Sequence, residues 1–117
     1  MKNLIDTSVW INHLREPVSE LVKILSRQGS IVMHPFVLQE LLLSNSKKSE
    51  ELVKQLKLFP ILNLASGLEI ENFLKDYPLR GKGIGLIDIH LLYGTIKSNL
   101  ILLTHDTKLE KVYNSLR

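Results

Sequence analysis

The sequence predicts an α/β fold in a single domain of 117 residues, with a mostly parallel central sheet and helices on both faces. Two observations predict it. Short, largely apolar segments at 3–5, 31–33 and 100–103 alternate with longer segments of helical periodicity. These short segments do not alternate apolar with polar residues, which is typical of parallel strands buried on both faces.

The first half of the chain is expected to hold two strands and four helices. The strand 3–5 is followed by a helix over 9–14 and a second helix from Pro17 to Gly29, since proline suits a first helical turn and glycine a helix end. The strand 31–33 comes next. The core face of the second helix is predicted from the i, i+3, i+4, i+7 spacing of Val18, Leu21, Val22 and Leu25. A helix from Pro35 to Leu43, a polar turn at 44–49 and an amphipathic helix over 52–59 complete this half.

The second half is expected to hold a weak strand at 61–64 and a helix from Ser66 to Tyr77. A glycine-punctuated loop at 78–85 then leads into a strongly apolar helix at 86–97 and the strand 100–103. The last helix is predicted to start at Thr107, because Thr107-x-x-Glu110 has the spacing of a capping box.

The composition narrows the class of protein. No apolar run approaches the ~18 residues that a membrane helix needs, and no cleavable signal pattern precedes the first strand, so a cytoplasmic location is expected. The chain has no cysteine, which excludes disulfides and thiolate metal sites. Its net charge of +3 permits a polyanionic partner without requiring one.

Four carboxylates stand at positions where a charge is costly. Asp6 and Asp106 each follow a predicted strand, where open α/β sheets form their ligand crevices. Thr7 and Ser8 could each cap the first helix and Thr107 the last, so neither aspartate is required for capping. Glu40 and Asp88 lie within largely apolar helical segments.

A cluster of these acids would need a cation. Two unit charges ~4 Å apart repel by ~4 kcal/mol at an effective dielectric constant of ~20. Carboxylate oxygens suit Mg²⁺ or Mn²⁺, and such ions activate water and stabilise the charge that develops in phosphodiester cleavage. The four acids together therefore point to metal-dependent phosphodiester chemistry, although any one alone could be a cap, a turn or a paired surface charge.

Each of the four acids lies in a distinctive segment: Leu4-Ile5-Asp6-Thr7-Ser8-Val9-Trp10-Ile11, His34-Pro35-Phe36-Val37-Leu38-Gln39-Glu40-Leu41, Gly81-Lys82-Gly83-Ile84-Gly85-Leu86-Ile87-Asp88-Ile89-His90-Leu91-Leu92 and Leu103-Thr104-His105-Asp106-Thr107-Lys108-Leu109. In this order along the chain, the four segments resemble PIN-domain proteins, and specifically the VapC-type toxins of toxin–antitoxin pairs. The chain departs from many such proteins at Gly85, where they carry serine or threonine.

The resemblance implies a metal-dependent endoribonuclease with a VapB-like antitoxin partner and a homodimeric assembly. It assigns catalysis and Mg²⁺ or Mn²⁺ binding to Asp6, Glu40, Asp88 and Asp106, with Glu40 and Asp106 acting directly or through water. It assigns supporting hydroxyl groups to Thr7 or Ser8 and to Thr104.

Basic side chains near these segments are candidates for contacts to the RNA backbone. They are Arg15, Arg80, Lys82, Lys108 and Lys111. The four histidines have no His-x-x-x-His spacing and are expected to be structural or surface groups, with His105 the one closest to an acid. The three glycines at 81, 83 and 85 match neither a Walker A loop nor a dinucleotide-binding motif.

Three other functions fit parts of the pattern. A signalling receiver domain would need a second acid beside Asp6 and a lysine after the last strand, where this chain has Thr104-His105-Asp106. A phosphatase of the haloacid-dehalogenase type would need aspartate at Ser8. A PIN fold that binds RNA or protein without catalysis remains as the alternative, which the intact acidic quartet disfavours.

Overall fold

A computed structural model describes the whole chain, residues 1–117, as three strands and seven helices. In chain order these are β1 (Asn3–Ile5), α1 (Thr7–Arg15), α2 (Ser19–Leu25), β2 (Ile31–Val32), α3 (Pro35–Leu43), α4 (Lys47–Leu56), α5 (Gly67–Asp76), α6 (Leu86–Lys97), β3 (Ile101–Leu103) and α7 (Thr107–Leu116).

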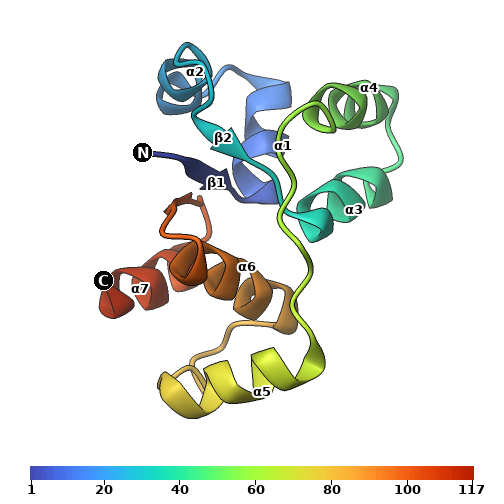
Figure 1. Cartoon of the computed structure of the whole chain (residues 1–117). Helices are drawn as coiled ribbons and strands as arrows, with labels where there is room; N and C mark the ends of the chain where they lie inside the picture. Colours follow the sequence, from blue (N-terminus) through green and yellow to red (C-terminus); the bar gives the residue numbers. More distant parts are fainter.

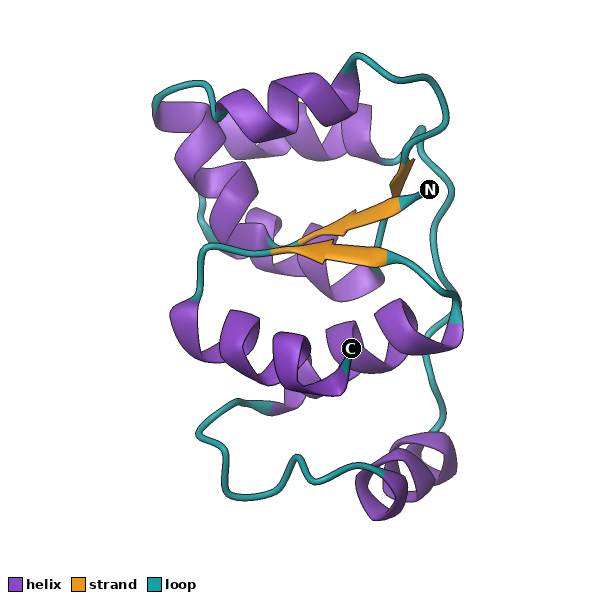
Figure 2. Ribbon diagram, turned by 90° about the vertical axis from the view of Figure 1, so that its left-hand side faces the viewer, coloured by secondary structure: helices purple, strands orange, loops and turns teal.

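The three strands form one parallel sheet in the order β2-β1-β3. Leu4 pairs with Val32 on one side and with Leu102 on the other, so β1 is the central strand. Helices from the first half of the chain cover one side of the sheet, and α6 and α7 cover the other (Figures 1 and 2). The predicted α/β fold is confirmed. The strand expected at 61–64 is absent, since Ile61 makes only an isolated bridge to Met33.

Parallel pairing determines where the site can form. All three strands point the same way, so the segments that follow them meet at one edge of the sheet. The chain enters α1 directly after β1 and α7 three residues after β3. The carboxyl ends of the two neighbouring strands therefore bring residues 6 and 104–106 together, although about a hundred residues separate them in sequence.

Two predicted N-caps and one predicted helix start were wrong, whereas the last helix begins at Thr107 as predicted. Asp6, not Thr7 or Ser8, is the N-cap of α1, and Asp106, not Thr107, is the N-cap of α7. A carboxylate is as good an N-cap as a hydroxyl, and these two face free amides of the first turn. The second helix begins at Ser19 instead of Pro17. By contrast, Ser66 forms the expected cap of α5, where its side chain and that of Glu69 make a capping box.

The hydrophobic core lies between the sheet and its two helical layers. Its largest fully buried side chains include Trp10 from α1 and Phe73 from α5. The predicted core face of α2 was shifted, because Leu21 and Ile24 are buried whereas Val22 and Leu25 are 48% and 39% exposed. Residues three apart share a helix face as well as those four apart, so the apolar pattern alone fits both faces.

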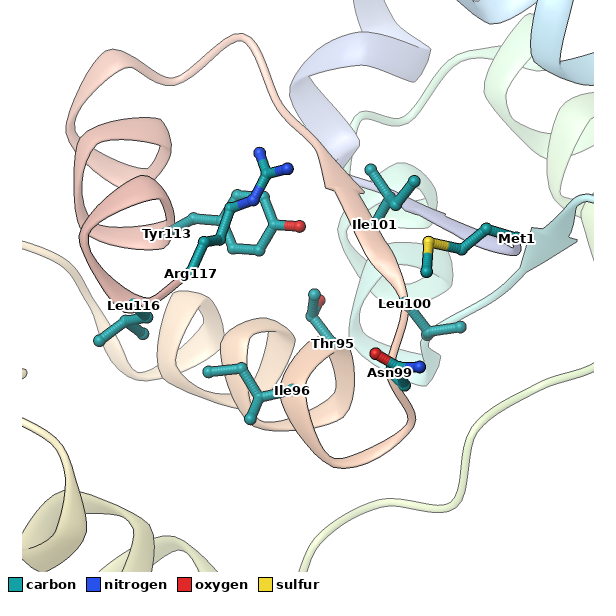
Figure 3. A pocket seen from close by; sticks show the side chains of 9 residues that line it. All are labelled: Met1, Thr95, Ile96, Asn99, Leu100, Ile101, Tyr113, Leu116 and Arg117. Carbon is teal, nitrogen blue, oxygen red and sulfur yellow. The ribbon is translucent and has the colours of Figure 1, made fainter.

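The opposite edge of the sheet carries no acid. A cavity of about 260 Å³ lies there, beside the starts of the strands, and Figure 3 shows the side chains around it. Leu100 and Ile101 line it at the start of β3, and Tyr113 and Arg117 from the end of the chain. The Tyr113 hydroxyl accepts a hydrogen bond from the Leu102 amide, which closes the outer edge of β3. No helix of the chain is long and apolar enough to cross a membrane.

Candidate active site

Four different elements supply the four predicted acids. Asp6 and Asp106 follow the neighbouring strands β1 and β3, while Glu40 lies in α3 and Asp88 in α6. Asp6 is buried, with 7% of its surface exposed, and Asp106 is exposed. The hydrogen bonds and charges described below show that the fold brings all four into one neighbourhood.

The Asp6 carboxylate is held by three donors. The Thr7 amide donates to Oδ1 at 2.8 Å, and the Ser8 hydroxyl donates to Oδ2 at 2.9 Å. The Thr104 hydroxyl also donates to Oδ2, at 2.7 Å. Hydrogen bonds of this kind offset the cost of burying a charge beside the core. Asp6 is therefore fixed in orientation, with no lysine or arginine beside it.

The three predicted hydroxyl groups connect the acids to one another. The Thr7 hydroxyl donates to Glu40 Oε1 at 2.6 Å. On the other side, the Thr104 hydroxyl accepts from the Asp106 amide at 3.0 Å while it donates to Asp6. Thr7 thus links Glu40, through its hydroxyl, to Asp6, through its amide, and the Thr104 hydroxyl links Asp6 to the backbone of Asp106. The Ser8 hydroxyl supports it by accepting from the His105 amide at 3.0 Å.

The charges of the other three acids affect the pKa of Asp88. Burial is the largest cause that raises the pKa of its carboxyl group above the ordinary value, and the negative charge of Asp6 is the next. The charges of Asp106 and Glu40 raise that pKa further. A hydrogen bond with the Gly85 backbone partly offsets the shift. The backbone thus supplies the polar contact that Gly85, lacking a hydroxyl, cannot supply from a side chain.

The donor set fits a hard divalent cation. Four carboxylates with no basic partner repel one another, and a bound cation relieves that repulsion. Their oxygens are the ligands that Mg²⁺ and Mn²⁺ prefer. No three histidine, aspartate or glutamate side chains are close enough to form a complete ligand shell by themselves. Octahedral magnesium sites commonly use one or two carboxylates with water and substrate phosphate, so such a shell is not required.

The predicted basic residues fall into three places. Lys82 and Lys108 line one groove together with Lys111. Arg80 lines an adjacent pocket that shares Lys82. Arg15, in the last turn of α1, lines neither. The groove also includes Ser115, which the sequence analysis did not identify. Its spacing of seven and four residues from Lys108 and Lys111 places all three on one face of α7 and could have identified it.

The histidines occupy structural positions. His34 caps α3 by accepting from the Phe36 amide, and burial, together with the nearby His90, lowers its pKa to about 4. The His90 ring packs against that of Phe36 with 4.8 Å between centroids. His105 Nδ1 lies 2.7 Å from the side-chain nitrogen of Asn12, which ties the loop after β3 to α1.

Comparisons with known proteins agree with this architecture. The family model described as "PIN domain" matches residues 4–115. Ribonuclease VapC32 of Mycobacterium tuberculosis is 35% identical over 92 residues, which cover 76% of this chain and 71% of that protein.

Solved structures share the fold at lower identity. A chain in the structure of VapBC-1 from nontypeable Haemophilus influenzae has a TM-score of 0.70 at 18% identity, covering 98% of this chain and 94% of its own. A chain of VapBC2 from Rickettsia felis, crystallised with a promoter DNA fragment, has a TM-score of 0.70 at 20% identity, covering 96% and 93%. At these identities the two structures establish the likeness of the fold.

Proposed function

The chain belongs to the PIN-domain family, and we propose that it is an endoribonuclease that cleaves RNA phosphodiester bonds with Mg²⁺ or Mn²⁺ as cofactor. We propose further that it is the toxin of a type II toxin–antitoxin pair and acts in the cytoplasm. The observation that carries the catalytic proposal is the convergence of four carboxylates, in which burial and then the charges of the other three acids raise the pKa of Asp88. The name of the mycobacterial relative, a ribonuclease, supports the same activity.

Each acid has a role in this proposal. Asp6 and Asp88 would hold the metal ion directly, and Glu40 and Asp106 directly or through water. The bound ion would activate water for attack and stabilise negative charge on the phosphate. Thr7, Ser8 and Thr104 act on the protein side: their hydroxyls fix Asp6 and Glu40 in orientation, so the carboxylates need not reorganise when substrate binds.

The proposed partners follow from the relatives. Two structural neighbours are chains in VapBC structures, and we propose a VapB-like antitoxin that covers the acidic site of this chain. We also propose a homodimer. Basic side chains, namely Arg15, Arg80, Lys82 and Lys108, are proposed to contact RNA phosphates.

The test is cleavage by the purified protein, free of antitoxin. It should cut RNA in Mg²⁺ or Mn²⁺ and stop when EDTA removes the ion. Expression should arrest growth, and co-expression of the product of the adjacent gene should relieve that arrest. RNA binding without any cleavage, under every divalent ion tried, would instead identify a non-catalytic PIN module.

A further inference from the structure

A groove lined by three lysines lies along α7. Lys82 enters it from the loop before α6, and Lys108, Lys111 and Ser115 enter it from one face of α7. The groove has a volume of about 370 Å³, and Val112 is its one apolar lining residue. Residues 108, 111 and 115 follow the i, i+3, i+7 spacing that aligns side chains along a helix.

The positive charges in this groove have no acidic partner. The one ion pair in the structure joins Lys54 to Glu51, on α4. Three ammonium groups around one groove repel each other, and no carboxylate lines it. An anionic ligand would relieve that repulsion, so the charge pattern favours a polyanion over an apolar or cationic partner.

Gly83 lets the loop and the helix come together. It has a φ of +78°, a conformation that side-chain-bearing residues rarely adopt. The Lys108 side chain lies across it, and its Nζ would be only 3.6 Å from a Cβ at this position. The arrangement holds Lys108 against the loop that carries Lys82, so the two lysines present their charges at the same place.

The helix that carries most of the groove starts at one of the acids. Asp106 Oδ1 accepts from the Lys108 amide at 2.9 Å and from the Leu109 amide at 3.1 Å, so the first lysine of the groove lies in the helical turn that a member of the acidic quartet caps. From Lys108 to Ser115 the helix rises about 10 Å. A ligand with one end at the acids and its negative charges along α7 has the form of an RNA strand.

We infer that this lysine groove, formed by Lys82, Lys108, Lys111 and Ser115, binds the RNA backbone on one side of the cleaved bond. The inference rests on the proposed ribonuclease function; it joins Lys111, already a candidate from the sequence, to Lys82 and Lys108 in one groove and adds Ser115 to the binding surface. The lysines neutralise phosphates without reading the base sequence. The groove therefore sets how long an RNA must be for tight binding, whereas the acids perform the cleavage.

The test measures RNA binding in EDTA, so that the RNA is not cut, at a series of salt concentrations. Each lysine that neutralises one phosphate adds ~0.7 to the salt slope of a single strand, which is about fivefold in affinity at 0.1 M salt. The variant with Lys82, Lys108 and Lys111 all changed to alanine should bind about 100-fold more weakly, with a slope smaller by about 2. In Mg²⁺ its KM for RNA should rise in parallel.

A matched control changes three exposed lysines on α4, Lys47, Lys48 and Lys54, to alanine and so makes the same change in net charge. It should keep the wild-type slope to within a few tenths of a unit. Equal slopes in the two triple variants would overturn the inference while leaving wild-type cleavage, and thus the proposed function, intact. Loss of antitoxin binding in place of RNA binding would also overturn it. A wild-type protein that neither binds nor cuts RNA would remove both proposals.

Discussion

The two sides of α6 each bury titratable side chains, with opposite consequences. Asp88 and His90 are two residues apart, a turn of about 200° around the helix. Asp88 faces the charges of Asp6, Glu40 and Asp106, whereas His90 packs against Phe36 and lies beside His34. Burial disfavours the charged form on both sides: it raises the pKa of Asp88 and lowers the pKa of His34 and His90.

The two sides of α6 differ in whether the buried groups are neutral or charged. A neutral histidine can be buried without an ion of opposite charge beside it. The His34–His90 side therefore needs no bound ion. The Asp88 side remains under repulsion while its acids are ionised, and only a cation removes that repulsion. The same burial therefore supports packing on one side of α6 and creates a candidate metal site on the other.

The largest expected effect is on the rate of RNA cleavage, which should fall for variants on the Asp88 side of α6 and not for those on the His90 side. Asp6→Asn, Glu40→Gln and Asp88→Asn should each lower RNA cleavage by on the order of 100-fold or more, because each removes a charge that the transition state requires. Asp106→Asn should lower cleavage less, and asparagine keeps the cap of α7. Initial rates in Mg²⁺ measure this.

His90→Leu is the control for those variants. It is buried in the same helix, two residues from Asp88, and its Nδ1 has no hydrogen-bond partner, so an apolar replacement leaves no donor or acceptor unpaired. Cleavage should stay within a few-fold of the wild type. If His90→Leu lost as much activity as Asp88→Asn, the distinction between the two sides would fail.

The next effect concerns stability in acid and acts on the histidine side. The pKa of His34 is about 4 in the folded protein against 6.5 when unfolded, so the unfolded chain binds the extra proton first. Its contribution is fully present above pH 6.5 and is lost as the pH falls toward 4. Between pH 7 and 4.5 this should cost about 2–3 kcal/mol of the free energy of unfolding, measured by urea denaturation.

His34→Asn isolates that contribution, since asparagine also caps a helix but does not titrate. The variant should lose less stability than the wild type over the same pH interval. Acids with a raised pKa work in the opposite direction, because Asp88 destabilises the fold where it is ionised and recovers stability as it is protonated. An identical pH dependence in the two proteins would show that His34 is not held neutral by the fold.

The smallest effect is a change of stability on the acidic side. In EDTA, Asp88→Asn should raise the free energy of unfolding by on the order of 1 kcal/mol, because it removes one of the repelling charges. In Mg²⁺ the wild type should gain ~2.7 kcal/mol at a hundredfold excess over its dissociation constant, a gain that the variant largely forfeits. Melting temperatures should therefore cross between the two conditions.

The exposed Glu71, on α5, provides the matched control. Glu71→Gln should change stability little and respond to Mg²⁺ as the wild type does. If Asp88→Asn were less stable than the wild type in EDTA and Mg²⁺ stabilised neither protein, the four acids would be ordinary structural groups.

The sequence by itself determined the fold class and the four acids of the candidate site. Strand segments and apolar helices are recognisable from the local order of residues, and a carboxylate among apolar neighbours is conspicuous without knowledge of the fold. The limits predicted for the apolar helix 86–97 agree with the structure, because Gly85 and Ser98 flank a mainly apolar segment. Local pattern failed where two choices were chemically equal, as with the caps at Asp6 and Asp106 or the buried face of α2.

Only the tertiary structure decided how those acids are connected. The bond from Thr7 to Glu40 spans 33 residues, and that from Thr104 to Asp6 spans 98. A periodic pattern over a few residues cannot predict contacts so far apart in sequence. Packing of α1 against α3 creates the first, and parallel pairing of β1 with β3 creates the second. The lysine groove has the same origin, since Lys82 reaches α7 only because the loop at Gly83 passes beneath Lys108. Residue chemistry is local, whereas the meeting of residues from separate elements depends on how the whole chain packs.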